Sequence, residues 1–226
     1  MVTQLQRKAA GFTLMELLIV ISIIAIVAAV AVPNLLSAKI SANESTAISL
    51  LRNLASVQVQ IANRQFIDID TDGHGEFGFF GELSGGVPPR NNGANALLPP
   101  LLAGSFQQVN NGIITRQGYH FVIYLPGANG VGLLENAGNY ALVDDDLAET
   151  VWCAYAWPSD FTTSGRNAYF INQVGEILRS DNLTQGYDGL ASVPAPDAAF
   201  LNAGSIAGIY NPGQAAVDGG VWTVLD

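Results

Sequence analysis

The strongest hydrophobic pattern is an apolar run close to the N-terminus. Of the sixteen residues 17–32 only Ser22 is polar, and the run counted from Phe12 is 21 residues long. About 20 apolar residues in a helix cross the hydrocarbon core of a bilayer. The sequence therefore predicts a membrane-spanning helix at residues 12–33, with Pro33 at its outer end.

Charges near this run predict its orientation and mark one unusual residue. Arg7 and Lys8 precede the run, and no acidic residue comes before Glu16. Basic residues on the N-terminal side keep that end in the cytoplasm, so the rest of the chain is expected outside. A carboxylate within a spanning helix costs about 2.5–3.5 kcal/mol, which predicts a functional role and a partner for Glu16.

The helical pattern continues beyond Pro33 in an amphipathic form. Ile48, Leu51 and Ile61 return on one face while polar residues occupy the others, and no glycine interrupts the segment. We expect residues 34–64 to continue the helix and to pack its apolar face on a sheet. Pro33 removes one helical hydrogen bond and is expected to kink or loosen the helix.

The rest of the chain has the pattern of short strands and turns. Strand-like segments occur at residues 119–125, 140–143, 151–157, 168–171 and 176–178. The last two are expected to form a hairpin across residues 172–175, while residues 85–104 and most of 182–220 read as loops. Strands without intervening helices predict an antiparallel sheet that the amphipathic helix covers on one face. The expected fold class is α+β, with a β-rich globular domain at residues 65–226.

The N-terminal features together resemble a known family. They are a basic leader at residues 1–11, the Gly11-Phe12 junction, the sequence Thr13-Leu14-Met15-Glu16, and an apolar helix ending at Pro33. This arrangement resembles the N-terminus of type IV pilin-like proteins, the class that includes type IV pilins and type II secretion pseudopilins. The resemblance covers about residues 11–61.

The resemblance implies a processing site and a set of partners. A prepilin peptidase would cleave after Gly11 and methylate Phe12. The mature chain would span the inner membrane once, with its N-terminus cytoplasmic and its globular domain periplasmic. An inner-membrane assembly platform would then polymerise copies of the chain into a pseudopilus or a surface pilus, with the helices of residues 12–33 bundled in its core.

Processing would also create a partner for Glu16. The new α-ammonium of Phe12 lies four residues before Glu16, and between staggered subunits the two charges can neutralise each other and fix the filament register. Two alternatives stay open. Glu16 could lie near the headgroups of an ordinary anchor, or the run could be a signal peptide cleaved near Ala38, Ala42 or Ala47.

Composition and charge limit the class of partner. Without Arg7 and Lys8, seven Lys and Arg residues remain against nineteen Asp and Glu residues, a side-chain charge of −12. This balance argues against nucleic acid as a partner and favours cations. The single cysteine, Cys153, cannot form an intramolecular disulfide, unlike the cysteine pair of many pilins. Its apolar neighbours predict a buried, inert thiol.

An acidic segment after the long helix matches the front half of a calcium-binding loop. Asp68, Asp70 and Asp72 stand at alternate positions before Gly73. Their oxygens can therefore converge on a hard cation such as Ca²⁺, while the glycine permits a sharp turn. Phe79 occupies the position where an EF-hand loop has its bidentate glutamate. A solvated acidic turn stays the alternative interpretation.

Other acidic residues extend this candidate set. Glu76 is predicted to be a further ligand, and Glu82 could substitute with different geometry. Some major pseudopilins bind calcium through a C-terminal loop, for which Asp181 and Asp188 are the nearest candidates here. Three consecutive aspartates at residues 144–146 are expected to form a charged turn.

Patterns that point to an enzyme are poor. His74 and His120 lack the spacing of a zinc site, and no glycine-rich turn is followed by the Gly-Lys-Ser/Thr of a phosphate loop. Trp152, Tyr155 and Trp157 could form a sugar-binding face, but their strand spacing favours a buried core stripe. The sequence therefore predicts a protein that is not an enzyme.

These features predict a structural subunit of a type II secretion pseudopilus or a type IV pilus. The acidic domain, the lack of a disulfide and the calcium-like loop favour the pseudopilin branch. The alternative from a different class is a membrane-tethered, exported binding domain that does not polymerise.

Overall fold

The long helix α1 is the first element of the structure. The computed structural model describes residues 11–90 and 95–225 and divides into two units, Met1–Lys39 and Ile40–Asp226. Helix α1 (Leu14–Asn63) includes Pro33 and is long and apolar enough to cross a membrane. Most of the predicted leader, including Arg7 and Lys8, lies outside the described residues.

The two parts of α1 differ in exposure. All residues from Gly11 to Lys39 are exposed in the first unit. From Ile40 onward one face of the helix is buried, through Ile40, Ala47, Leu51, Leu54, Val57, Gln58 and Ile61. Apart from the adjacent pair Val57 and Gln58, successive members are three, four or seven residues apart, which is the predicted amphipathic pattern.

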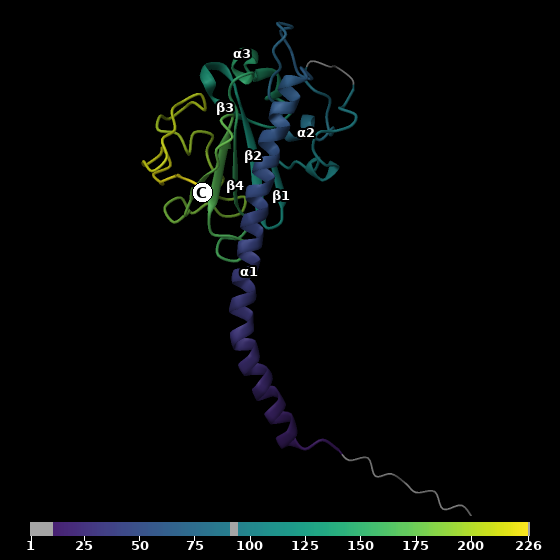
Figure 1. Ribbon diagram of the computed structural model, residues 1–226, viewed down its shortest axis with the longest axis vertical. Helices are drawn as coiled ribbons and strands as arrows, with labels where there is room; N and C mark the ends of the chain where they lie inside the picture. Colours follow the sequence, from purple (N-terminus) through teal and green to yellow (C-terminus); the bar gives the residue numbers. More distant parts are fainter. Residues whose placement is uncertain (1–10, 91–94, 226) are drawn as a thin grey trace, which may run out of the picture. The chain divides into compact units, whose positions relative to one another are not determined.

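The globular unit contains an antiparallel sheet, as the sequence predicts. Its strands are β1 (Ile113–Arg116), β2 (Tyr119–Pro126), β3 (Gly132–Leu134), β4 (Cys153–Pro158), β5 (Ala168–Asn172), β6 (Leu178–Ser180) and β7 (Thr223–Val224). The order is β1-β2-β4-β5-β6-β7, and β3 also pairs with β2. Figure 1 shows the second part of α1 lying across these strands, which confirms the α+β fold.

Short helices fill the connections of this unit. They are α2 (Phe80–Leu83), α3 (Asp145–Ala148), and the 3-10 turns η1 (Gly104–Phe106), η2 (Ala128–Gly130) and η3 (Tyr140–Leu142). The predicted strand at residues 140–143 is wrong, because backbone bonds such as Leu142 N–H to Asn139 O close a local turn. The predicted charged turn at residues 144–146 is instead the start of α3, which Asp144 caps by accepting the N–H of Leu147.

Both faces of the sheet are buried. On β2, the side chains that pack in the cluster containing α1 are Tyr119, Phe121, Ile123 and Leu125. On the opposite face of β2, Val122 and Tyr124 belong to a second core cluster. The strand therefore lies between two apolar layers, and neither of its faces is in contact with solvent.

Trp152, Tyr155 and Trp157 are buried core residues, as predicted, but they do not form a single stripe. Trp152 lies in the cluster with α1, whereas Tyr155 and Trp157 lie in the second cluster. Cys153 is buried beside them, and burial raises the pKa of its thiol well above the ordinary value. The thiol is therefore unreactive, as the sequence predicts.

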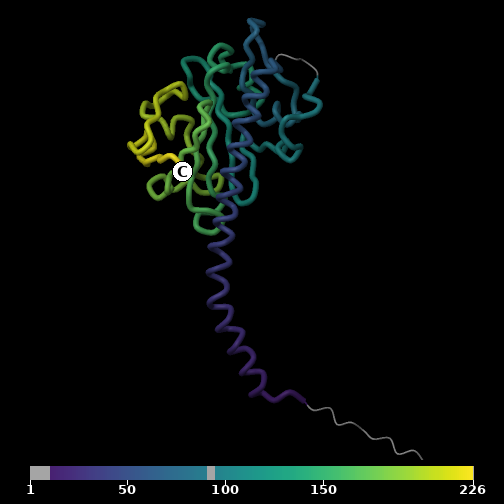
Figure 2. Tube along the Cα trace, viewed as in Figure 1, coloured from purple at the N-terminus to yellow at the C-terminus, as the bar shows by residue number. Residues whose placement is uncertain are grey.

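The second face is covered by the irregular C-terminal segment, residues 181–222, drawn in yellow-green to yellow in Figure 2. Its apolar side chains in the second cluster are Tyr187, Ala198, Ala199, Phe200, Ile206 and Trp222. Polar tips of sheet aromatics bind its backbone. Tyr155 Oη donates to Pro196 O at 2.9 Å, and Trp157 Nε1 donates to Gly189 O at 2.7 Å. These bonds hold a cover that lacks a regular element.

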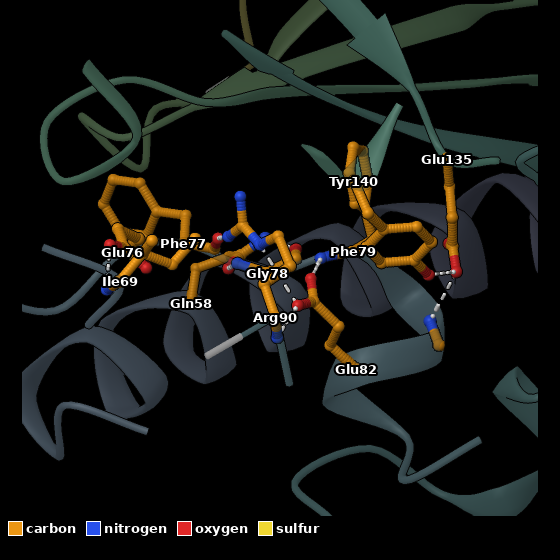
Figure 3. Close-up of polar contacts among 11 residues, drawn as sticks. Gln58, Ile69, Glu76, Phe77, Gly78, Phe79, Glu82, Arg90, Glu135 and Tyr140 are labelled. Atoms are coloured by element: carbon orange, nitrogen blue, oxygen red, sulfur yellow. Dashed lines mark hydrogen bonds and ion pairs between the residues drawn. The ribbon is translucent and has the colours of Figure 1, made fainter. Parts of the chain in front are cut away.

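A buried amide joins α1 to the segment that follows it (Figure 3). Gln58 Nε2 donates to Gly78 O at 2.8 Å, and Gly78 N–H donates to Gln58 Oε1 at 2.9 Å. The same segment touches the helix at Gly75, where an added Cβ would lie 2.2 Å from Ala62 O. This contact fixes the start of the segment that carries the acidic loop and α2.

We predict that Gln58→Ala lowers the free energy of unfolding by about 2–4 kcal/mol, because it leaves the N–H and C=O of Gly78 buried without partners. Urea unfolding of residues 34–226 is the measurement, since Ile40 is the first buried residue in the described part of the chain. Gln60→Ala is the matched control, because Gln60 is exposed on the same helix, and we expect a change within about 0.5 kcal/mol. Equal effects of the two variants would contradict the stabilising role of the hydrogen bonds between Gln58 and Gly78.

Candidate functional site

The N-terminal candidate residues form a helix cap. Thr13 precedes α1, and its N–H and Oγ1 each donate to Glu16 Oε2 at 2.8 Å. In return, Glu16 N–H donates to Thr13 Oγ1 at 3.1 Å. This reciprocal pattern is a capping box, whose signature is Thr-x-x-Glu. Sequence reasoning missed this role, although the spacing could have revealed it.

The cap places the predicted cleavage junction outside the helix. Gly11 and Phe12 have no helical assignment and are exposed, and α1 begins only after Thr13. The cap also holds the Glu16 carboxylate at the N-terminus of the helix, where the helix dipole favours negative charge. The cleavage junction therefore lies outside the helix, whereas the Glu16 carboxylate lies in its first turn.

The three aspartates of the predicted calcium loop do lie together. Each of Asp68, Asp70 and Asp72 offers an oxygen within 4.8 Å of the others. Asp72 Oδ1 accepts the N–H of His74 at 2.7 Å, which tightens the turn. Gly73 adopts a φ of +92°, the left-handed conformation that glycine permits.

A second group of carboxylates adjoins the first. Asp70 also lies within 4.8 Å of Asp146 and Glu149, measured between their carboxylate oxygens. Burial, followed by the neighbouring charges of Asp72 and Asp70, raises the pKa of Glu149. Sequence reasoning did not find Asp146 and Glu149 because only the folding of α3 beside the loop brings them to Asp70.

The remaining predicted ligands have other contacts. Glu76 is buried, its Oε1 accepts the N–H of Ile69 at 2.8 Å, and burial raises its pKa to about 7. It belongs to neither of the two carboxylate groups found among the described residues. Asp188 Oδ1 accepts the N–H of Phe161, and Asp181 Oδ1 accepts the N–H of Leu183.

Beyond Glu76 the chain forms a buried polar cluster (Figure 3). Glu82 Oε1 pairs with Arg90 Nε at 3.1 Å, and Glu82 Oε2 accepts the N–H of Phe79 at 2.9 Å. Arg90 also donates to the carbonyl of Phe77. Burial raises the pKa of Glu82, and the Arg90 charge opposes that shift. The ion pair ties Arg90 to α2, and the bond to Phe77 ties it to the segment before α2, so Glu82 has a structural role.

Comparison with known proteins identifies the N-terminal segment. Residues 6–32 match the model of the prokaryotic N-terminal methylation motif. The predicted resemblance to type IV pilin-like proteins is therefore confirmed for this segment. Together with the apolar helix, the motif suggests that α1 is a membrane anchor.

One relative gives this similarity more detail. Over 62 residues the chain is 50% identical to the type IV wide pilus major component PilA4 of Thermus thermophilus. The alignment covers 26% of this chain and 47% of that protein, so it spans about half of the relative's length. No solved structure matches the chain. The similarity lies in the N-terminal part of the chain, and most of the globular unit lies outside the aligned residues.

Calcium binding at the acidic loop stays a prediction, which thermal unfolding can test. We expect calcium to raise the melting temperature of residues 34–226, because binding to the folded state alone adds about 2.7 kcal/mol at 100 times the dissociation constant. Magnesium should do less, since its octahedral shell fits a flexible carboxylate loop poorly.

The matched variants are Asp70→Asn, which removes the residue shared by both groups, and Asp181→Asn in the C-terminal loop. The first should abolish the calcium shift and the second should preserve it. An unchanged melting temperature in calcium, magnesium and chelator would reduce the loop to an acidic turn. A shift that survives Asp70→Asn but not Asp181→Asn would move the site to the C-terminal loop.

Proposed function

We propose that the chain is a non-enzymatic structural subunit of a type IV pilus or a type II secretion pseudopilus. The observation that carries this proposal is the methylation motif at residues 6–32, which overlaps the start of α1. Every described residue of α1 up to Lys39 is exposed. An apolar surface of this size needs lipid or neighbouring helices to cover it. In a subunit that moves from the membrane to a filament, lipid would cover this surface first and neighbouring helices would cover it afterwards.

Processing at Gly11-Phe12 is the first step of this proposal. A prepilin peptidase would cleave after Gly11 and methylate Phe12. The exposed backbone outside the helix at this junction supports the assignment, because cleavage there needs no unwinding of α1. The capping box survives cleavage, since Thr13 and Glu16 both remain in the mature chain.

Membrane insertion and assembly follow from the same segment. We place a single span at residues 12–33 in the inner membrane, with the N-terminus cytoplasmic and the globular unit periplasmic. The assembly platform would extract the span into a filament of copies of this chain. Pro33 would loosen the helix where the span ends.

Glu16 would then change partners. In the single chain its Oε2 accepts both donors of Thr13. In a filament the Phe12 ammonium of a neighbour would approach the same carboxylate, which the cap already holds in one conformation. An ammonium left unpaired in lipid is costly, so this contact favours one register over the others.

The two branches rest on different observations. The pilus branch is supported by the relative, which is a type IV wide pilus component. The pseudopilus branch is supported by the acidic composition and the single, buried Cys153. A tethered binding domain that never polymerises is the remaining candidate. Expression with a pilus or a pseudopilus assembly system separates the three, because only a subunit forms filaments.

We predict that the mature chain begins at Phe12 and carries one N-methyl group. Intact-mass and N-terminal analysis of protein from membranes of a host with prepilin peptidase is the measurement. Gly11→Ile should block cleavage, because a bulky β-branched side chain would replace a glycine at the junction. A chain that still begins at Met1 in such a host would overturn the processing site.

We also predict that Glu16→Val and Glu16→Gln both lower filament yield more than about tenfold, because either change leaves a neighbour's ammonium uncompensated. Membrane levels should stay normal, since both replacements remove a charge from the span. Sheared filaments and membrane fractions are quantified in parallel.

Glu16→Gln separates the charge from the cap, because its side-chain carbonyl can still accept both Thr13 bonds. Thr13→Val is the converse control, since it removes the hydroxyl of the cap and keeps the charge, and it should assemble. If Glu16→Gln assembles normally while Thr13→Val fails, the cap and not the charge pair is what assembly requires.

A further inference from the structure

Glu135 is a buried carboxyl group that follows β3 and contacts two short elements. Its Oε1 accepts the N–H of Gly81 in α2 at 3.0 Å and the hydroxyl of Tyr140 in η3 at 2.8 Å (Figure 3). Gly81 permits this close approach, because an added Cβ would lie 2.6 Å from Glu135 Oε1. One oxygen of Glu135 therefore joins α2 to η3.

The second oxygen of Glu135 is in a different situation. Oε2 is buried and makes no hydrogen bond within the described residues 11–90 and 95–225. A buried polar atom without a partner calls for an explanation. Either the group is ionised and Oε2 shares an uncompensated charge, or the group is neutral and Oε2 carries the proton.

The basic residue of this cluster is engaged by another carboxylate. Arg90 Nε pairs with Glu82 Oε1 at 3.1 Å, and Arg90 also donates to the carbonyl of Phe77. Arg90 thereby compensates the charge of Glu82, whose Oε2 accepts the N–H of Phe79 at 2.9 Å. In the part of the chain that the structure describes, no cation forms an ion pair with Glu135.

The balance of the groups around Glu135 favours its neutral form. Burial raises the pKa of Glu135, the charge of Glu82 on α2 raises it further, and the hydrogen bonds from Tyr140 and Gly81 oppose the shift. The segment of residues 104–112, which reaches the same hollow, has no ionisable side chain. A buried charge without a counter-ion costs more than a buried O–H without an acceptor.

The surroundings give the carboxyl group a way out to water. A hollow of about 340 Å³ lies beside Glu135, and its lining includes Gly81, Asn136 and Tyr140. Residues 136–138 are exposed, so Glu135 stands directly before a turn in solvent. A displacement of this turn would bring the carboxyl group into water and break both of its hydrogen bonds.

We propose that Glu135 is a proton-controlled latch, whose neutral carboxyl group holds α2 against η3 and whose ionised form releases them. In the closed state the proton lies on Oε2, and Oε1 keeps its two hydrogen bonds. When a base in the solvent takes the proton, the carboxylate moves into water together with residues 136–138. The latch concerns the globular unit alone, so it does not depend on whether the chain polymerises.

The raised pKa of Glu135 determines the direction of the response. Between the ordinary pKa of a glutamate and the raised one, the closed state binds one proton more than the open state. The stability that the proton gives to the closed state is complete at acidic pH and is lost as the pH rises through this window. The equilibrium constant for opening should rise by up to about tenfold for each pH unit inside the window.

Hydrogen-exchange mass spectrometry of the full chain in detergent micelles tests the latch. Exchange is followed from about pH 5 to about pH 9, a range that begins just above the ordinary glutamate pKa. The rates are corrected for the pH dependence of the chemical exchange step. In the wild type we expect the protection of α2 and of residues 135–142 to fall as the pH rises, with β4 and β5 as the internal reference.

Three variants assign the response. Glu135→Gln is a neutral mimic of the closed state, because its carbonyl can accept from Gly81 and Tyr140 and its amino group replaces the O–H, so it should abolish the pH dependence. Tyr140→Phe removes a hydrogen bond that opposes the rise of the pKa, so it should move the fall in protection to higher pH. Glu176→Gln, at a partly exposed carboxylate between β5 and β6, should leave the response unchanged.

The latch is contradicted if the protection of α2 is independent of pH in the wild type, or if its pH dependence persists in Glu135→Gln. Loss of the dependence in Glu82→Gln but not in Glu135→Gln would assign the proton to Glu82 instead. Circular dichroism verifies that each variant is folded. If Glu135→Gln does not fold, Tyr140→Phe decides, because an unshifted pH response in that variant would overturn the proposal.

Discussion

The globular unit depends on one constraint, which is that its central strands are apolar on both faces. Residues of β2, β4 and β5 alternate between two core clusters, and neither face can be left in water. The second part of α1 covers one face. Among the described residues no helix contributes to the cluster on the other face, and the irregular segment of residues 181–222 covers that face through Phe200, Trp222 and their neighbours. The two covers and the sheet form three layers.

Much of the helix and sheet could be predicted because their patterns are local. The period of Ile48, Leu51 and Ile61 marked the helix, and alternation marked the strand at residues 119–125. The second cover could not be predicted, because residues 182–220 lack any period and are placed by tertiary contacts. The second core could not be predicted either, because a polar hydroxyl such as that of Tyr124 suggests a partly exposed strand face. In the structure this hydroxyl is buried and donates to Pro194 O.

The candidate sites show the same division between local and tertiary information. The motif around Gly11, Phe12 and Glu16 is a short, fixed spacing, and the sequence was enough to find it. The aspartates at residues 68–72 are local as well, and they do converge. In contrast, the approach of Asp146 to Asp70 and the isolation of Glu135 Oε2 arise only when distant segments pack. Glu76 was predicted to be a further metal ligand. The sequence did not reveal that Glu76 is buried and accepts the N–H of Ile69.

The position of the second cover in the chain bears on how the unit folds during synthesis and export. The helical cover comes first in the sequence, the sheet strands follow, and Phe200 and Trp222 come after them. Until these residues emerge, Val122, Tyr155 and Phe170 present an uncovered apolar face. Such a face is prone to aggregation while it waits. A chain that emerges N-terminus first therefore passes through a half-finished state with one side sealed, and its lifetime is set by the time needed to deliver the remaining segment.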